Sequence, residues 1–155
     1  NLVRSFDAVK REISYVQQRE TLPDRLTLRG CLTYTAKLRL TSDASPADVE
    51  RCVQDAAARV GLTAQLDLTI ERLSGGQRKR ASLANELLIP PRVLLLDEVT
   101  SGLDEQTDRE IMQLLRRLAS ESGITIACVT HTLANVPEYC DSMVVLAEGG
   151  VLAYH

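Results

Sequence analysis

The sequence predicts an α/β fold in which a parallel sheet is joined to a group of α-helices. Two apolar runs, residues 93–96 and 124–129, are typical of strands that are buried on both faces of a parallel sheet. The intervening residues 105–120 carry apolar side chains at helical spacing, which predicts an amphipathic crossover helix. Strand, helix and strand in this order form the pattern of a parallel α/β core.

The segment before this core predicts one more strand and three helices. Residues 12–16 predict a short strand, and residues 17–25 predict a loop because they are polar and contain Pro23. Ser45 is a typical residue to begin a helix, and Gly61 is a typical residue to end one. The three helices are expected at residues 28–40, 46–60 and 77–89.

The residues after the core predict a short helix and a hairpin. The helix is expected near residues 133–139, and the strands at residues 143–147 and 151–154. Glu148-Gly149-Gly150 between them is typical of a tight turn.

Composition and charge narrow the class of protein. The chain is 45% apolar and 25% charged, which is typical of a globular protein, and its net charge of -3 disfavours a nucleic-acid partner. No apolar run approaches the ~20 residues needed to span a bilayer, and we expect no signal peptide. We expect the four cysteines to be reduced core thiols of a cytosolic protein. Because the chain begins with Asn1 in mid-pattern, we interpret it as a piece of a longer protein.

The segment Ser74-Gly75-Gly76-Gln77 has the spacing of a capping box at the start of a helix. Two glycines weaken a helix by ~1 kcal/mol each, but they leave bare amides at its positive end, where an anion can bind. A helix that merely begins with a Gly-Gly turn explains the segment equally well. The following Arg78-Lys79-Arg80 is interpreted as a solvated helix face.

Two carboxylates, Asp97 and Glu98, follow the apolar run at residues 93–96. The carboxyl end of a parallel strand is where α/β folds bind ligands. Asp97 could hold Mg²⁺ through water, and Glu98 could activate a water beside a phosphate. The alternative is a pair of solvated acids, although four apolar residues deliver both acids to the sheet edge.

Single polar residues follow the other two strands. His131 comes shortly after residues 124–129, where a neutral imidazole could hydrogen-bond a phosphate oxygen. Gln18 follows the first strand, and its amide could ligate Mg²⁺ or hold water. Taken singly, the histidine is also explained by a structural role and the glutamine by a polar surface.

Together, these segments resemble the nucleotide-binding domain of the ATP-binding cassette (ABC) family. Leu73–Gln77 resembles its signature motif, Leu94–Glu98 its Walker B strand and catalytic glutamate, and Ser101-Gly102-Leu103-Asp104 its D-loop. His131 resembles the H-loop histidine and Gln18 the Q-loop glutamine. The segments at residues 75–82, 100–104, 26–29 and 38–40 look most like subfamily G, the white/pigment exporters.

The resemblance implies a P-loop NTPase-like parallel-sheet core, present in part, with an α-helical signature subdomain. Residues 1–155 would then be a partial ABC ATPase domain, with residues 19–89 as the helical subdomain and 90–155 as the core with Walker B, D-loop and H-loop. It further implies an ATPase that drives transport, dimerises head to tail with a second nucleotide-binding domain, as a homo- or heterodimer, and works with a fused or separate transmembrane domain. Its place would be the cytoplasmic face of a membrane.

For the site, the resemblance implies ATP and Mg²⁺ as cofactors. It assigns catalysis to Glu98 and His131, and metal binding to Asp97 and Gln18. The nucleotide-binding residues would be Ser74, Gly75, Gly76, Gln77, Gln18, Ser101 and Asp104.

Two departures from the family pattern stand out. Val99 replaces the usual proline after the glutamate, with little expected effect on chemistry. None of the three lysines, Lys10, Lys37 and Lys79, follows a glycine, so no Walker A loop is present in these residues. We therefore expect the isolated chain to be inactive.

Two other functions are compatible with the sequence. A truncated chain could serve as a non-catalytic interaction module that docks a partner. A soluble ABC ATPase acting on DNA or ribosomes is the other alternative, but the net charge disfavours it. The 54 residues from 19 to 72 also leave no room for a long coiled-coil insertion.

Overall fold

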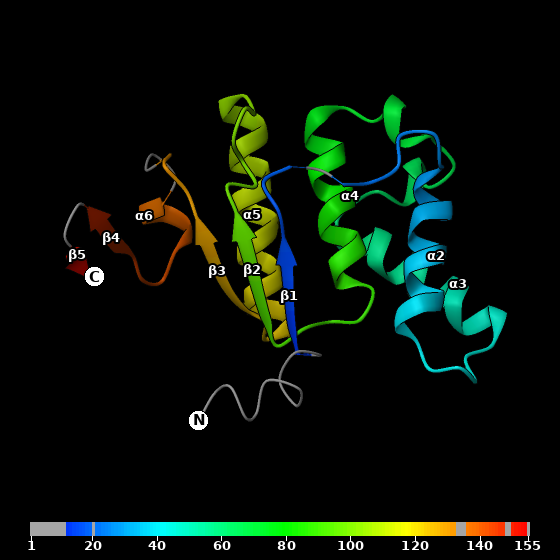
Figure 1. Ribbon diagram of the computed structural model, residues 1–155. Coiled ribbons are helices and arrows are strands. Elements are labelled where there is room, and N and C mark those ends of the chain that lie inside the picture. Colours follow the sequence, from blue (N-terminus) through cyan, green and yellow to red (C-terminus); the bar gives the residue numbers. More distant parts are fainter. Residues whose placement is uncertain (1–11, 20, 133–135, 148–149, 155) are drawn as a thin grey trace.

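A three-stranded parallel sheet forms the centre of the computed structural model, which describes residues 12–19, 21–132, 136–147 and 150–154 (Figure 1). The strands are β1 (Ile13–Val16), β2 (Val93–Asp97) and β3 (Thr125–Val129), in the order β1-β2-β3. Ile13 pairs with Val93, and Val93 pairs with Thr125. The predicted parallel α/β core is therefore confirmed.

Three helices lie between β1 and β2 and form one side of the molecule (Figure 1). They are α2 (Leu28–Arg39), α3 (Pro46–Arg59) and α4 (Gly75–Leu87), with short 3-10 turns η1 (Thr63–Gln65) and η2 (Ile70–Arg72) before α4. Capping side chains begin each helix: Thr27 for α2, Ser45 for α3 and Ser74 for α4. Because the Ser74 capping box sets its start, α4 begins two residues earlier than the predicted residue 77.

A continuous apolar core joins these helices. Leu32 of α2, Val53 of α3 and Leu83 of α4 are completely buried within it. Backbone hydrogen bonds also join the loop after β1 to the segment before α4, since Ile70 N donates to Leu26 O at 2.9 Å and Glu71 N donates to Asp24 O at 3.1 Å. The loop that carries Gln18 is thus connected to the start of α4.

The long helix α5 (Glu105–Ser122) connects β2 to β3 and lies behind the sheet in Figure 1. Its buried stripe contains Ile111, Leu114, Leu115 and Leu118, as the sequence pattern predicts. Gly123 ends the helix in the left-handed conformation, with φ of 63°.

The C-terminal elements are a short helix α6 (Val136–Tyr139) and an antiparallel pair, β4 (Val144–Ala147) and β5 (Gly150–Tyr154). These bounds agree with the predicted helix and hairpin, while residues 133–135 and the turn residues 148–149 lie outside the described residues. Within the described part of the chain, no helix has both the length and the apolar character needed to cross a bilayer.

The prediction that β2 and β3 are buried on both faces is wrong. In β3, Ile126 and Cys128 are half-buried and the other three residues are exposed, and β2 is buried on one face only. Leu94 and Leu96 are buried against the α5 side, but Leu95 is 38% exposed. Tyr15 of β1 pairs with Leu95 and is 49% exposed. Val129 of β3 pairs with Asp97, two residues further along the same face, and is 61% exposed. Alternate residues of a strand point to opposite faces, so α5 can cover only one of them. We call Tyr15, Leu95 and Val129 the open face.

The open face predicts self-association of the isolated chain, since an exposed apolar sheet surface favours contact with a second copy. We expect sedimentation velocity to show oligomers that grow with protein concentration. Leu95→Thr combined with Val129→Thr should reduce them without unfolding the chain, because threonine is well tolerated in strands.

Leu94→Thr is the matched control, because Leu94 lies on the buried face of the same strand. It should lower the free energy of unfolding by roughly 2–5 kcal/mol, as large-to-small core changes do. A wild-type chain that stays monomeric at every concentration would contradict this prediction.

Candidate functional site

The three parallel strands bring Gln18, Asp97, Glu98 and His131 to one edge of the sheet. Gln18 follows β1, Asp97 ends β2 and His131 follows β3. The carboxyl ends of parallel strands meet at the same edge, where α/β folds bind ligands. Side chains widely separated in the sequence are therefore neighbours here.

Glu98 is the centre of this group. The Gln18 amide nitrogen Nε2 donates to Glu98 Oε2 at 2.6 Å. On the other side, His131 Nδ1 lies 3.2 Å from Glu98 Oε1. The Glu98 side chain is 28% exposed, so this carboxylate is partly shielded while remaining open to water and ligand.

The backbone of Glu98 has an unusual conformation. Its φ of 46° is the left-handed region, which costs a non-glycine residue of order 1–3 kcal/mol. Two backbone bonds hold it there: Glu98 N donates to Val129 O at 2.9 Å, and Ser101 N donates to Glu98 O at 3.0 Å. This turn directs the side chain out of the strand and toward Gln18 and His131, and places the half-buried Ser101 close behind it.

The geometry of His131 restricts how it could contact a phosphate. A carboxylate only accepts hydrogen bonds, so Nδ1 must carry the proton when it bonds Glu98. In the neutral imidazole Nε2 is then an acceptor. Donation to a phosphate oxygen through Nε2 requires either the imidazolium or a ring that has left Glu98.

Asp97 has a partner that the sequence reasoning missed. The Tyr15 hydroxyl donates to Asp97 Oδ2 at 2.9 Å, and this bond raises the pKa of Tyr15. Tyr15 pairs with Leu95, so period-2 alternation places Tyr15 and Asp97 on the same face of neighbouring strands. The alternation of side chains along the two strands is the sequence pattern from which this contact could have been predicted.

A metal site in this group would have to be completed by other ligands. Among the described residues, no three His, Cys, Asp or Glu side chains gather closely enough to form a metal site on their own. Mg²⁺ is commonly held by one or two carboxylates together with water and substrate phosphates. The carboxylate of Asp97 and the amide oxygen of Gln18 fit that requirement.

The predicted capping box at the start of α4 is confirmed. Ser74 Oγ accepts from Gln77 N at 3.3 Å, and Gln77 Oε1 accepts from Ser74 N at 3.0 Å. The box uses the amides of Ser74 and Gln77 and leaves those of Gly75 and Gly76 at the positive end of the helix, where Ser74 and Gly75 are exposed.

The second glycine has a packing role that the sequence did not reveal. A Cβ on Gly76 would lie 2.5 Å from the Thr107 methyl carbon Cγ2, whereas a Cβ on Gly75 would meet Leu103 at 3.7 Å. Thr107 cannot easily turn away, because its Oγ1 donates to Asp104 Oδ2 at 2.7 Å. The start of α4 therefore packs directly against the start of α5.

Asp104 caps α5 and is held strongly in that role. Its Oδ1 accepts from Thr107 N at 3.0 Å, in addition to the bond from the Thr107 hydroxyl. These bonds lower the pKa of Asp104, so its carboxylate stays ionised at neutral pH. The structure thus joins the segment containing Ser101 and Asp104 to the glycine pair.

We expect Gly76→Ala and Gly75→Ala to differ in stability. At Gly76 the new methyl clashes with Thr107, which should cost ~1–3 kcal/mol. At Gly75 there is room, and alanine is the better helix former by up to ~1 kcal/mol. Chemical denaturation of both variants measures the difference, and equal stabilities would contradict the close packing of Gly76 on Thr107.

The prediction that Arg78-Lys79-Arg80 is a solvated helix face is wrong for Lys79, which is only 9% exposed. Its Nζ donates to the backbone oxygen of Gln18 at 2.8 Å. Arg78 bonds Asp24 and Arg80 bonds Glu110. The three basic residues connect α4 to the loop after β1 and to α5.

The cysteines agree only in part with the predicted core thiols. All four are free, but Cys31 is buried, Cys52 and Cys128 are half-buried and Cys140 is exposed. Burial raises the pKa of Cys128 to about 11, which makes its thiol a poor nucleophile. Cys140 was therefore wrongly predicted as a core residue.

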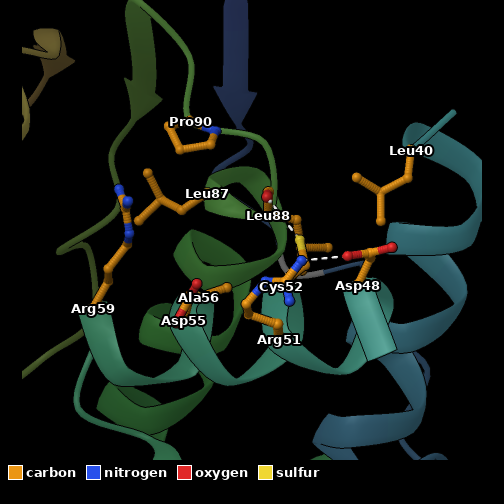
Figure 2. Close-up of a pocket in the computed structure, with 10 residues that line it drawn as sticks. All are labelled: Leu40, Asp48, Arg51, Cys52, Asp55, Ala56, Arg59, Leu87, Leu88 and Pro90. Carbon is orange, nitrogen blue, oxygen red and sulfur yellow. Dashed lines mark hydrogen bonds and ion pairs between the residues drawn. The ribbon is translucent and has the colours of Figure 1, made fainter. Parts of the chain in front are cut away.

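A cavity of about 250 Å³ lies away from the strand ends, between α3 and the end of α4 (Figure 2). Figure 2 shows charged side chains of both signs in its lining, with Arg51 bonded to Asp48. Cys52 donates to Leu88 O at 2.9 Å, and burial raises its pKa. These internal pairings favour a structural role for the cavity.

Comparison with known proteins places these features in a family. Residues 3–101 match the family described as ABC transporter. An ABC transporter ATP-binding/permease protein of Mycobacterium tuberculosis is 38% identical over 99% of this chain and 18% of its own length. A methionine import ATP-binding protein of Burkholderia orbicola is 38% identical over 92% of this chain and 41% of its own length. An ABC transporter G family member of Dictyostelium discoideum is 35% identical over 96% of this chain and 20% of its own length.

Two solved structures share the fold. The cbiO1 protein of Clostridium perfringens, part of an ABC transporter complex, has a TM-score of 0.87 and 32% identity over 97% of this chain and 59% of its own. A dimeric ATP-binding cassette bound to ADP and phosphate has a TM-score of 0.80 and 27% identity over 98% of this chain and 66% of its own. The chain spans less than half the length of the curated relatives named above. Sequence motifs, fold and family match agree, and the chain belongs to the ABC transporter family.

Proposed function

We propose that this chain is the ATP-binding and ATP-hydrolysing part of a subunit that powers transport across a membrane. The observation that carries the proposal is the grouping of Gln18, Asp97, Glu98 and His131 around the carboxyl ends of β1, β2 and β3. A carboxylate held between an amide and an imidazole, one residue from a second carboxylate, suits the hydrolysis of a phosphoanhydride.

Glu98 and His131 are the catalytic residues in this proposal. Glu98 orients a water molecule and polarises it for attack on the γ-phosphate of ATP. The hydrogen bond from Gln18 and the neighbouring His131 hold the carboxylate in one direction. His131, which is 67% exposed, can reach a phosphate oxygen once Nε2 carries a proton.

Asp97 and Gln18 would hold Mg²⁺, which supplies positive charge to the phosphates of the nucleotide when bound. Asp97 contributes a carboxylate oxygen at the end of β2. Gln18 directs Nε2 toward Glu98, which leaves its amide oxygen for the metal or its water. Tyr15 holds Asp97 from the side.

The start of α4 and the segment before α5 would contact the nucleotide of a second cassette. Gly75 and Gly76 would present their amides, Ser74 would offer its exposed hydroxyl, and Gln77 fixes the start of the helix through the capping box. Ser101 and Asp104 lie beside this surface through the packing of Thr107 on Gly76. A head-to-tail dimer, homo- or heteromeric, brings these residues to the partner's ATP.

We further propose that the cassette belongs to subfamily G and works with a fused or separate transmembrane domain at the cytoplasmic face of a membrane. The segments at residues 75–82 and 100–104 support this branch. Residues 19–89 form the helical subdomain and 90–155 the core in this proposal. The acidic net charge supports a partner other than nucleic acid.

Two measurements test the proposal. The full-length protein that carries these residues should hydrolyse Mg-ATP in a steady-state assay. The isolated 155 residues contain no Gly-x-x-x-x-Gly-Lys segment, so calorimetry should show no binding of Mg-ATP tighter than roughly millimolar. A full-length protein without turnover, or micromolar binding by the isolated chain, would argue against the assignment.

A further inference from the structure

Lys79 occupies an unusual position for a lysine. It lies in the second turn of α4 and is only 9% exposed. Residues four apart share one face of a helix, so Lys79 belongs to the same buried stripe as Leu83 and Leu87. Its ammonium group donates to the backbone oxygen of Gln18 at 2.8 Å.

Burying an ammonium group costs free energy that an apolar side chain would not require. A methionine would fill the same space on the α4 stripe at lower cost. Gln18 itself is exposed, so water could satisfy its carbonyl oxygen in the absence of Lys79. The lysine is therefore better explained by what it positions than by the stability it adds.

What it positions is the Glu98 carboxylate. Lys79 holds the main chain of Gln18, and the side chain of Gln18 donates to Glu98 Oε2 at 2.6 Å. Two successive contacts thus join the start of α4 to Glu98. A displacement of the Gln18 main chain would move its amide off the carboxylate.

We propose that Lys79 is a positioning residue that fixes the Gln18 loop on α4 and so keeps the Gln18 amide against Glu98. The catalytic part of this inference rests on the proposed ATPase function. Through these contacts, the start of α4, where the second nucleotide would bind, is coupled mechanically to Glu98 of the same chain.

Arg80 provides the matched control, one residue away on α4. It pairs with Glu110 of α5 and makes no part of the path from Lys79 to Glu98. Arg80→Met removes a basic group from the same helix, as Lys79→Met does. Lys79→Arg keeps a cationic donor and tests rescue.

The first experiment uses the isolated chain and needs no nucleotide. In Lys79→Met the nuclear magnetic resonance signal of the Gln18 side-chain amide should shift toward its solvated position. The Gln18 and Arg19 backbone amide signals should shift as well, because the Gln18 carbonyl loses the hydrogen bond from Lys79. Lys79→Arg should restore both readouts in large part, and Arg80→Met should leave them at wild-type values.

The same chains are compared by thermal unfolding. Lys79→Met should melt close to Arg80→Met. A Lys79→Met chain that fails to fold, or an unchanged Gln18 amide signal in a folded one, would overturn the proposal, since Lys79 would then be a stabilising core residue or an incidental neighbour.

The second experiment uses the full-length protein. Lys79→Met should lower kcat for ATP by on the order of 10- to 100-fold with little change in KM, because a small misplacement of a catalytic group costs that much. An unchanged kcat would overturn the role of the contact between Lys79 and Gln18 in catalysis. Absence of turnover in the wild type would instead contradict the proposed ATPase function. The amide measurements alone would then test whether Lys79 holds the Gln18 loop on α4.

Discussion

Replacement of Glu98 by glutamine in the full-length protein is expected to lower ATP turnover by about 10²–10⁴-fold while ATP stays bound. The new side chain keeps its shape, and its amide oxygen can still accept from Gln18 Nε2. It loses the negative charge that polarises the attacking water. Asp97 is untouched, so nucleotide affinity should persist and the ATP-bound dimer should accumulate.

Steady-state ATPase assays and size-exclusion chromatography with ATP measure these two effects. Glu105→Gln is the matched control, because Glu105 is an exposed acid that pairs with Arg109 on α5. The control should retain wild-type turnover. Near-normal hydrolysis by Glu98→Gln would remove Glu98 from the mechanism and make it a strand-end acid without catalytic function.

Ser74→Arg should also abolish turnover, by a different route. Ser74 is exposed at the start of α4, and an arginine there would cover the amides of Gly75 and Gly76. The variant should still bind ATP in each subunit but should fail to form the ATP-dependent dimer. Equilibrium binding and size-exclusion chromatography separate these two steps.

Loss of the helix cap is a competing cause, worth about 1 kcal/mol. Ser45→Arg controls for it, because Ser45 begins α3 with the same kind of capping box. If Ser45→Arg stopped dimerisation as well, general destabilisation would account for both variants. A Ser74→Arg protein that dimerises normally would exclude the start of α4 from the interface.

The fold was predictable where the sequence pattern is local. Ser45 and Ser74 carry their capping partners three residues away, so the helix starts could be read directly. The apolar runs of β2 and β3 likewise predicted strands. The open face was not foreseen for β2, because whether a helix covers Leu95 depends on packing rather than on the strand's own residues.

The site residues were predictable by type and by position after each strand, but their contacts were not. The burial of Lys79 and its bond to Gln18 join residues that lie 61 apart in the sequence. The close approach of Thr107 to Gly76 arises only when α5 packs against α4. Such contacts depend on how elements meet in space. The roles of Gln18, Asp97, Glu98 and His131 stay predictions.

The pairing of β1 with β2 has a consequence for the order of folding. Ile13 pairs with Val93 across three intervening helices, so this contact closes a very long loop. The chain must lose the conformational entropy of that loop before the strand pairing can stabilise the fold. The locally capped helices α2, α3 and α4 are expected to form earlier. Gln18 and Glu98 then meet only in the last stage of folding, so a chain arrested before that stage would contain the helices without a catalytic centre.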